Sequence, residues 1–508
     1  MMKRILLSGT IFLVLKTFAQ EPADALRYSW FTPSGTARSM ATGGALTSLG
    51  GDLTSTFVNP AGIALYKTGE LVFTPGFTLN NNKSKYLGTT EKDSKNIFNI
   101  GTSGIIFATP SSGRSNWRNF SYSIAYNRTA NFNNSYAFRG RNDISSYSEK
   151  YLEELINNNV TDPNAAANDF PFGSSLAFNT YLIDTIDNNG NVTGYRSQAT
   201  PQTGVNQEQQ ITTKGGISTI GFAGSANLGE KLYLGASLGI DMLNFEKNST
   251  YTESDATTNS ANNFNNFKVN ETLETEGTGI NLKLGLIYKP VEYLRLGIAF
   301  HTPTFYELRD KYTTTVTTDL EGYAGPGTLT QSSNDLVGQP GEFQYSFTNP
   351  WRVMGGVSYV FREVKDVTKQ RAFISADVEY VNYASSSFSE SGTTSSGYFS
   401  ELNKTVDNQL TSAFNFKLGG ELKFNTWMFR GGFGYFSNPY KDKTVNASRM
   451  NISGGLGYRD KGKFVDLTYV HQLGKNVYYP YRLEGNEFFP VNVNGVVGNI
   501  ILTFGFKF

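Results

Sequence analysis

Apolar and polar residues alternate along most of the chain. Between Ile280 and Tyr288 every even-numbered position is apolar, whereas the odd-numbered positions are mostly polar or glycine. The stretch from Leu232 to Met242 repeats this pattern, and so do residues 294–300, 351–361, 372–380, 414–424 and 450–458. A period of two places the apolar side chains on one face of a β-strand. These stretches match a tilted membrane strand of about 9–11 residues better than the shorter strands of a soluble sandwich.

The same alternation predicts about fourteen strands, an even number, as in single-chain bacterial outer-membrane barrels. They are centred near residues 70–80, 97–109, 119–138, 211–227, 232–247, 267–289, 294–315, 342–362, 371–388, 411–424, 427–437, 448–459, 463–474 and 491–508. No apolar run after the N-terminus approaches the roughly 20 residues of a membrane-spanning helix. We therefore expect an all-β fold, an antiparallel transmembrane β-barrel in the outer membrane of a Gram-negative cell.

The lengths of the connections support a barrel. Short turns are expected at residues 227–231, 289–293, 425–426 and 459–463. Between them lie long loops rich in Asn, Ser, Thr and Gly, at residues 139–211, 248–266, 316–341, 389–410, 438–447 and 475–490. Short periplasmic turns that alternate with long external loops are typical of outer-membrane barrels.

Aromatic residues are placed where a membrane interface would put them. Those that flank the short turns are Tyr288, Tyr293, Phe361, Phe424, Trp427, Tyr458 and Phe464, and we interpret them as an interfacial girdle. The alternative is the ordinary cross-strand aromatic pairing of a soluble β-protein. The chain ends in an alternating segment, residues 500–508, whose last residue is Phe508. This ending resembles the signal that the barrel-assembly machinery reads, so we expect that machinery as a partner during biogenesis.

The N-terminus has the pattern of a secretory signal peptide. Met1 to Arg4 carries positive charge, residues 5–14 are mainly apolar, and Thr17-Phe18-Ala19 is a cleavage signal. A transmembrane anchor is the alternative, but the apolar run is shorter than the roughly 20 residues that span a bilayer. We expect residues 1–19 to be a signal peptide, residues 20–68 to be an N-terminal hatch and residues 69–508 to be the barrel.

The segment before the first strand does not alternate. Small residues dominate it, so its backbone can pack closely and turn sharply. Because a wide lumen would otherwise be an open pore, this segment is a candidate plug. Asn59-Pro60 is a turn initiator, since Pro fixes one dihedral angle and Asn bonds nearby backbone amides. The candidate hatch residues are Gly43, Gly44, Asn59, Pro60, Ala61 and Gly62.

Composition excludes several functions. The 44 Lys plus Arg residues balance 43 Asp plus Glu residues, so nucleic acid is not an expected partner. With 0 Cys and 2 His, we expect no metal site and no cofactor. The enzymatic alternative is a hydrolase with a Ser–His pair that uses His301 or His471. A histidine in a barrel lumen is usually part of a polar network, so we expect no enzyme activity.

Several motifs resemble those of the FadL family of outer-membrane transporters of hydrophobic compounds. They are residues 38–45, Gly51-Asp52 and Asn59-Pro60-Ala61-Gly62 before the barrel, and residues 294–303, 351–353 and 430–439 within it. The resemblance implies a fourteen-stranded barrel with an N-terminal hatch. It also implies uptake of long-chain fatty acids or other hydrophobic molecules, which leave sideways into the membrane at a kink in the third strand. Asn and Gly breaks near Asn127–Asn134 are compatible with this exit.

Strand parity points a set of charged residues into the lumen. They are Asp241, Lys283, Arg295, Arg352, Asp377, Glu379, Lys417, Glu421, Arg430 and Arg459, and their mixed signs predict salt-bridge networks around the plug. The candidates for contact with a ligand or with the lumen are Arg38, Phe57, Arg295, His301 and Arg352. The longest loop, at residues 139–211, comes earlier than the large ligand-capturing loops of the family's fatty-acid members.

The expected mechanism is passive. External loops capture an apolar solute, with Phe170, Phe172, Phe178 and Tyr181 as candidate contacts, and the solute moves into an apolar site behind the hatch. Burial of each CH₂ group contributes about 0.8 kcal/mol, so a long chain binds without an energy source. The expected partners are hydrophobic small molecules and outer-membrane lipid. Two alternatives remain: a PorV-like barrel of type IX secretion that holds a protein partner, and a trimeric diffusion porin without a plug.

Overall fold

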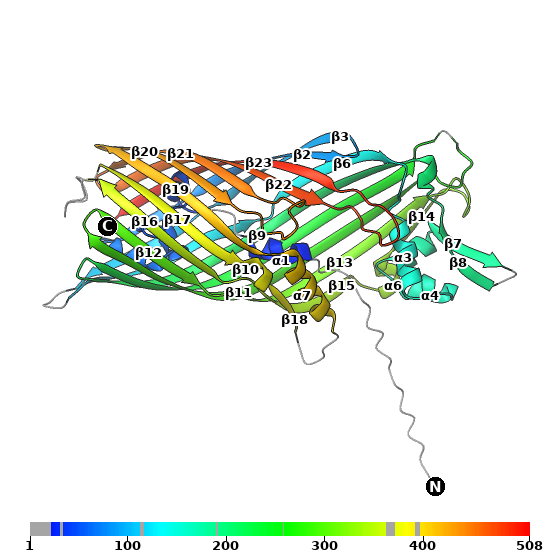
Figure 1. Cartoon of the computed structure of the whole chain (residues 1–508), viewed down its shortest axis with the longest axis horizontal. Helices are drawn as coiled ribbons and strands as arrows, with labels where there is room; N and C mark the ends of the chain where they lie inside the picture. The colour runs from blue at the N-terminus through cyan, green and yellow to red at the C-terminus, as the bar shows by residue number, and fades with distance from the viewer. Residues whose placement is uncertain are drawn as a thin grey trace, which may run out of the picture.

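The wall of the molecule is a closed antiparallel barrel. The computed structural model describes residues 22–30, 34–111, 116–188, 191–257, 259–361, 371–391 and 397–508, and the predicted signal peptide lies outside them. Fourteen strands of this described part form the wall, as the alternation predicted. The last strand pairs with the first, which closes the barrel: Phe73 lies opposite Phe504, and Gly76 lies opposite Ile501 (Figure 1).

Several wall strands consist of two segments separated by a short break. In chain order the wall contains β1 (Glu70–Phe73) with β2 (Pro75–Tyr86), β3 (Thr89–Ile100) with β4 (Ser103–Pro110), β5 (Trp117–Asn131) with β6 (Asn134–Asn142), β9 (Val205–Leu228), β10 (Leu232–Asp255), β11 (Asn266–Val291), β12 (Leu294–His301) with β13 (Phe305–Asp319), β15 (Gly341–Thr348) with β16 (Arg352–Phe361), β17 (Ala372–Asn382) with β18 (Ser387–Glu390), β19 (Ser412–Phe424), β20 (Trp427–Phe436), β21 (Arg449–Asp460), β22 (Lys463–Tyr478) and β23 (Val491–Lys507).

The other described elements lie inside the barrel or at its loop end. They are α1 (Pro22–Ser29), α2 (Ala37–Ala41), η1 (Leu53–Thr56), η2 (Pro60–Leu65), α3 (Glu149–Asn157), α4 (Pro163–Asn168), α5 (Ser174–Asn179), β7 (Ile183–Asn188), β8 (Asn191–Ser197), η3 (Pro201–Thr203), β14 (Thr328–Ser332), α6 (Ser333–Val337), η5 (Tyr383–Ser385) and α7 (Tyr398–Gln409). No helix in the described ranges is long and apolar enough to cross a bilayer.

Side-chain burial follows the predicted parity. On β11 the even-numbered apolar residues Ile280, Leu282 and Leu284 are exposed on the outside, whereas Asn281 and Lys283 are buried inside. The prediction of the aromatic girdle is wrong for one residue, Phe464. Phe464 is only 6% exposed, because β22 turns its odd-numbered residues outward and Phe464 packs in the lumen. The other six girdle residues are exposed on the outside.

The predicted turns are confirmed, but several loops are shorter than expected. The β10–β11 hairpin runs up to the pair Ser254 and Asn266, so most of the predicted loop 248–266 is strand. The first two strands likewise extend to a tight turn at Leu87-Gly88, where both residues have positive φ, as a two-residue hairpin favours. The outward faces of these extensions are polar, whereas Tyr251, Phe267 and Val269 of the β10–β11 hairpin point inward and are buried. An alternation with its apolar residues outward therefore cannot reveal them.

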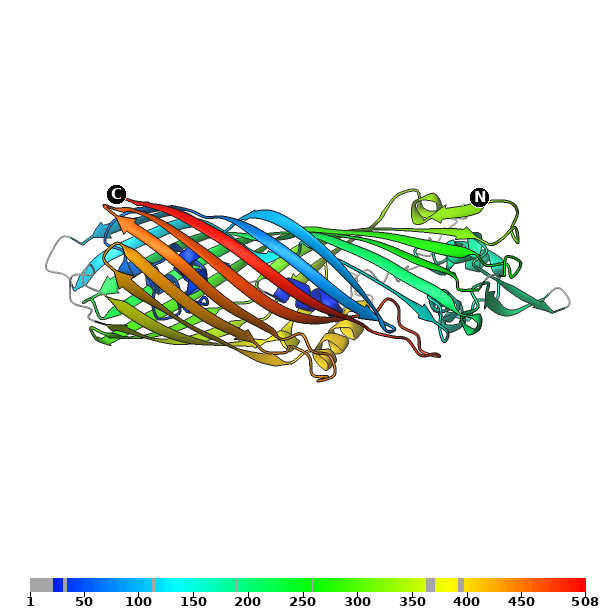
Figure 2. The same cartoon turned by 90° about the horizontal axis from the view of Figure 1, so that it is seen from above.

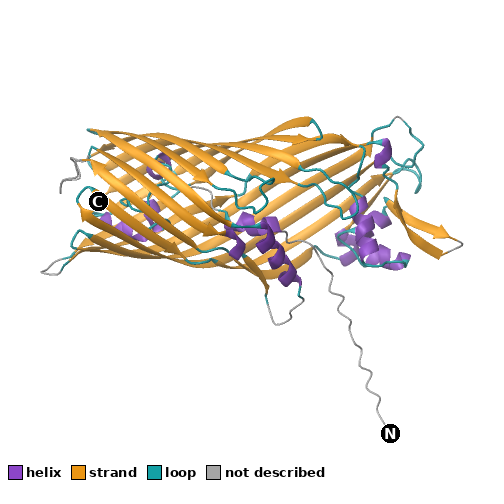
Figure 3. Cartoon of the chain, in the orientation of Figure 1, coloured by secondary structure: helices purple, strands orange, loops and turns teal. Residues whose placement is uncertain are grey.

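The two ends of the barrel differ. The short turns and the C-terminus lie at one end, here called the turn end, and the helices α3 to α6 gather at the other, the loop end (Figures 1 and 3). The longest connection, residues 143–204, follows the third strand as predicted. It folds into α3, α4, α5 and a separate hairpin of β7 and β8. Its core is aromatic: Tyr147, Tyr151, Tyr251 and Tyr481 pack together.

Candidate functional site

The N-terminal segment occupies the lumen. Of the predicted hatch at residues 20–68, the part from residue 34 to residue 66 lies within the wall toward the turn end (Figure 2), and we call this part alone the hatch. Its helix α2 packs against β20 to β23, and η2 packs against β9 to β11. The hatch residues Ala37, Met40, Leu49, Leu53 and Ile63 are all buried. In the described structure this segment therefore fills the lumen toward the turn end, and its role as a plug stays a prediction.

Side-chain caps hold the short helices of the hatch. Thr36 accepts a hydrogen bond from the Ser39 amide at the start of α2, and Asp52 accepts one from the Thr54 amide at the start of η1. Such caps satisfy backbone donors that a helix leaves free at its first turn. The Thr36 hydroxyl also donates to Asp52 Oδ2 at 2.7 Å. This bond joins α2 to η1, so the hatch is held as one unit.

Asn59 ties the hatch to itself and to the wall. Its Oδ1 accepts from the Ala61 amide at 3.1 Å and caps η2, in which Pro60 takes the first helical position. Its Nδ2 donates to Thr47 O within the hatch at 2.6 Å. The same amide lies 3.2 Å from Leu286 O on β11 and 3.3 Å from Ile298 O on β12. Both polar atoms of this fully buried side chain are therefore used, because an amide supplies the donor and the acceptor together.

Glycines of the wall make room for the hatch backbone. A Cβ on Gly285 would overlap Asn59 Oδ1, and a Cβ on Gly297 would overlap Thr47 O. The other inward strand glycines that face the hatch are Gly221, Gly235, Gly356, Gly419, Gly432 and Gly455. Sequence reasoning missed this set, although inward parity at successive strands would have revealed it. Close backbone approach is a recognised role of strand glycine.

Two hatch glycines are required by their backbone conformation. Gly43 and Gly44 have φ values of 65° and 76°, a region that side chains disfavour. A Cβ on Gly43 would also lie 2.7 Å from Phe433 O on β20. The turn after α2 can thus approach the wall only with glycine at position 43.

The Gly285→Ala substitution is expected to unseat the hatch without unfolding the barrel. The new methyl group would overlap Asn59 Oδ1, whereas the ladder between β11 and β12 stays intact. Limited proteolysis of the refolded protein measures this: cleavage within residues 34–66 should rise at least tenfold. Gly431→Ala is the matched control, because a Cβ there meets nothing within 4 Å. Equal protection of the two variants would contradict the assignment.

Ion pairs surround the hatch, as the lumen charges predicted. Arg430 donates to both Glu421 and Asp466 at 2.6 Å, and Arg38 of the hatch reaches Glu421 at 3.4 Å. Arg38 also donates to Gly51 O at 2.8 Å. These buried groups are paired, so they fix the hatch rather than offer free charge.

A second ion-pair network lies in the lumen where α1 ends. Glu379 accepts from Arg352 at 3.2 Å and from Lys417 at 2.9 Å. Arg352 also donates to Ser29 O at the end of α1, at 2.6 Å. The network therefore links the wall to the segment that precedes the hatch.

The remaining predicted contact residues also meet the hatch. Arg295 donates to Leu49 O at 2.7 Å, and His301 Nε2 lies 2.9 Å from Val58 O. Phe57 packs with Ile106 and Phe464 in a small apolar cluster. The structure thus gathers four of the five predicted residues around residues 34–66, whereas Arg352 bonds Ser29 before them. Contact of these residues with a ligand stays a prediction. Among the described residues no group of three His, Cys, Asp or Glu side chains could hold a metal ion.

An apolar and aromatic cluster fills the middle of the lumen. We call it the lumen cluster; its inward wall residues include Leu243, Phe245, Leu273, Tyr306, Leu308, Tyr345, Phe347, Val381 and Phe388. Helix α1 contributes Ala25, Leu26 and Tyr28 to it. The ring of Tyr28 meets Phe347 edge to face at 5.8 Å. Sequence reasoning missed this cluster, because inward positions of a barrel are normally polar.

The wall has a gap in its hydrogen bonding at the third strand. β5 ends at Asn131 and β6 begins at Asn134, with a bulge just before the break. β6 lies beside β2 and β3, and Asn82 Nδ2 of β2 donates to Ser135 O of β6 at 2.6 Å. Among the described residues, β3 pairs with β2 alone, so its other edge has no ladder. The break falls at the position that the family resemblance implied.

The rings proposed for ligand capture are mostly packed. Phe170 and Phe178 lie against the aromatic core of the loop end, and Phe172 packs on Tyr312 at 5.7 Å. Tyr181 is the exception, with 46% of its surface exposed. Three of the four candidates therefore support the loop fold in this structure.

Comparison with solved structures shows the fold. A FadL homologue from Pseudomonas aeruginosa superposes with a TM-score of 0.58 and 13% identity over 94% of this chain and 100% of the other. The toluene transporter TodX of P. putida gives 0.53 and 13% identity over 94% of this chain and 99% of its own. No protein-family model matches the sequence, and a search of curated proteins gives no match.

Proposed function

We propose that this chain, which has the fold of FadL-type channels, lies in the outer membrane and conducts hydrophobic molecules passively. The two similar proteins are named as a FadL homologue and a toluene transporter, which supports hydrophobic cargo and a transport role over an enzyme. The single observation that carries the proposal is the lumen cluster, a large apolar and aromatic site inside a barrel whose lumen also holds buried polar residues and ion pairs.

The proposed route has three stages. Cargo enters at the loop end and reaches the lumen cluster, where it takes the place of the apolar side chains of α1. A shift of the hatch or of α1 then opens the way toward the third strand. The exit lies where the unpaired edge of β3 faces β6 and the inner wall is not closed by a ladder. Entry takes apolar surface out of water and release returns the cargo to the hydrocarbon of the membrane, so no energy source is needed.

We propose long-chain fatty acids as the cargo, with aromatic hydrocarbons as the second candidate class. An aliphatic chain gains about 0.8 kcal/mol for each CH₂ group buried, so affinity should rise with chain length. The aromatic residues of the lumen cluster also suit planar hydrocarbons. A protein partner, as in the PorV-like alternative, would instead dock at the loop end.

A binding measurement separates these functions. Equilibrium dialysis of purified protein with radiolabelled oleate and with toluene should show saturable binding of at least one. Phe347→Gln should weaken it by about ten- to a hundredfold, because an amide replaces a ring worth about 1.5–3 kcal/mol of apolar burial. Phe264→Gln, in the equally buried core of the loop end, is the matched control and should leave binding unchanged. No binding of either compound, with secreted proteins co-purifying, would favour the secretion role.

A further inference from the structure

Three neighbouring strands carry glycine at one level of the outward face. The register places Gly420 of β19 beside Gly431 of β20, and Gly431 beside Gly454 of β21. The next outward residues along β20 are Phe429 and Phe433, both exposed. The glycine backbone therefore forms the floor of a trough that runs across the strands between ridges of large side chains.

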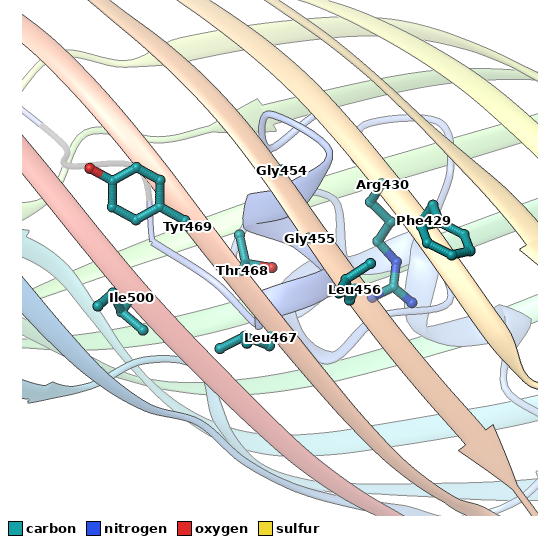
Figure 4. A pocket seen from close by; sticks show the side chains of 9 residues that line it. All are labelled: Phe429, Arg430, Gly454, Gly455, Leu456, Leu467, Thr468, Tyr469 and Ile500. Carbon is teal, nitrogen blue, oxygen red and sulfur yellow. The ribbon is translucent and has the colours of Figure 1, made fainter.

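The trough opens into a cavity at Gly454. This cavity has a volume of about 590 Å³ (Figure 4). Its walls are apolar or aromatic side chains from β20 to β23, namely Phe429, Leu456, Leu467, Tyr469 and Ile500. These side chains are themselves exposed on the outside of the barrel. The cavity thus belongs to the outer surface and not to the lumen.

The hatch does not explain the outward glycines. It accounts for the inward ones, since a Cβ on Gly432 would overlap the Gly43 amide. A Cβ on Gly431 would meet nothing within 4 Å, and one on Gly454 would meet only Arg430 O at 3.9 Å. Neither residue has a positive φ. Neither crowding nor backbone conformation thus requires glycine at these two positions, and what the glycines leave is open space.

The depth of the trough identifies the chemistry of its occupant. On β20, Gly431 lies midway between two exposed aromatic residues, Trp427 and Tyr435, each about 13 Å away along the strand. Aromatic residues of this kind mark the two membrane interfaces, so the trough lies at the level of the hydrocarbon core. Lipid headgroups lie outside the hydrocarbon core, and the outward side chains of the walls carry no charge. Arg430 and Thr468 also line the cavity, but their side chains point into the lumen and are buried.

A slender occupant fits better than a second barrel. The rim residues Phe429 and Leu456 stand above the glycine floor and hold another convex wall away from it. A hydrocarbon chain can enter between them and touch protein on three sides. If the trough stayed empty, its walls would lose those dispersion contacts. Small residues such as glycine permit another chain to approach the backbone closely within a membrane.

We propose that the trough at Gly431 and Gly454 binds one acyl tail of an outer-membrane phospholipid. The site lies outside the lumen and holds a resident lipid, so it goes beyond the transport function. It rests only on the membrane placement proposed above. A tail seated on the glycine floor covers the wall directly behind the hatch, where Gly455 faces Ala41.

Native mass spectrometry tests this site. Wild type and Gly431→Leu/Gly454→Leu are inserted into vesicles of palmitoyl-oleoyl phosphatidylethanolamine and phosphatidylglycerol, three to one, extracted in mild detergent and weighed intact. Wild type should retain one phospholipid that the double variant lacks. Gly355→Leu, an outward glycine of β16 whose Cβ meets only Val378 at 3.8 Å, is the control and should retain it. Gly431→Ala/Gly454→Ala, which fills less space, should give an intermediate occupancy and guards against a folding defect.

The other outcomes overturn the proposal. Equal phospholipid retention by wild type and the leucine variant would show that the trough holds no tail. Dimers of wild type that the leucine variant abolishes would assign the trough to a second copy of the chain. If oleate added to the vesicles replaces the phospholipid mass, the site belongs to cargo. Because insertion into vesicles is scored separately by protease protection, failure of membrane placement is distinguished from failure of the site.

Discussion

A disulfide between the hatch and the wall is expected to abolish uptake of hydrophobic solutes, and a reductant is expected to restore it. The Ser48 hydroxyl of the hatch lies 2.5 Å from the Ser358 hydroxyl of β16, so Ser48→Cys/Ser358→Cys would place two sulfurs within reach of a bond. The chain has 0 Cys, so no other thiol can compete. Uptake of labelled oleate into vesicles should fall to the level of empty vesicles when the bond is oxidised.

The wall supplies a matched control for this lock. Ser358 also lies 2.9 Å from Ser375 of β17, so Ser358→Cys/Ser375→Cys joins two wall strands and leaves the hatch free. This variant should transport normally in both redox states. Full uptake by the oxidised hatch-to-wall variant would show that the hatch need not move at Ser48.

Asn59→Ala is expected to have the second-largest effect, a loosened hatch and a leaking barrel. Removing the amide leaves the carbonyl of Thr47 without its donor and η2 without its cap. A buried acceptor without a partner costs about 1–3 kcal/mol, and loss of an N-cap costs about 1 kcal/mol. A loss of about 3 kcal/mol corresponds to roughly a hundredfold larger population of the undocked hatch.

Hydrogen exchange and conductance measure this effect together. Amides of residues 34–66 should exchange about a hundredfold faster in Asn59→Ala, and single barrels in planar bilayers should show open events that wild type lacks. Asn82→Ala removes a buried amide that bonds β6 and not the hatch, so its hatch exchange should match wild type. Unchanged hydrogen exchange in Asn59→Ala would mean that the ion pairs of Arg38 and the glycine contacts hold the hatch in place without Asn59.

The barrel could be predicted because the alternation that defines its strands involves residues close together in the sequence. A period of two decides which face each residue takes, so Lys283 and Arg352 could be placed in the lumen from parity alone. Phe464 shows the limit of this reasoning. Its aromatic ring and its place beside a turn indicated the girdle. Even-numbered residues of β22 near this turn face the lumen, however, and Phe464 follows them.

The site could be predicted only in part, because its contacts join residues far apart in sequence. Asn59 was identifiable as a cap from Asn59-Pro60, whereas its bonds to Leu286 O and Ile298 O depend on how the barrel closes around it. The lumen cluster violates the polar-inside expectation, so the alternation could not indicate it. The gap beside β3 is an absence of pairing within the described wall, and a sequence pattern does not encode which strand edges remain unpaired.

The central claim is that the barrel passes hydrophobic molecules and excludes polar ones without an energy source. Its most direct test is solute entry into sealed vesicles that contain the purified protein, with no nucleotide and no membrane potential. Labelled oleate or toluene should enter these vesicles faster than empty ones, whereas a labelled sugar of similar size should stay outside. Equal entry of the sugar, or no acceleration of either hydrophobic solute, would contradict it.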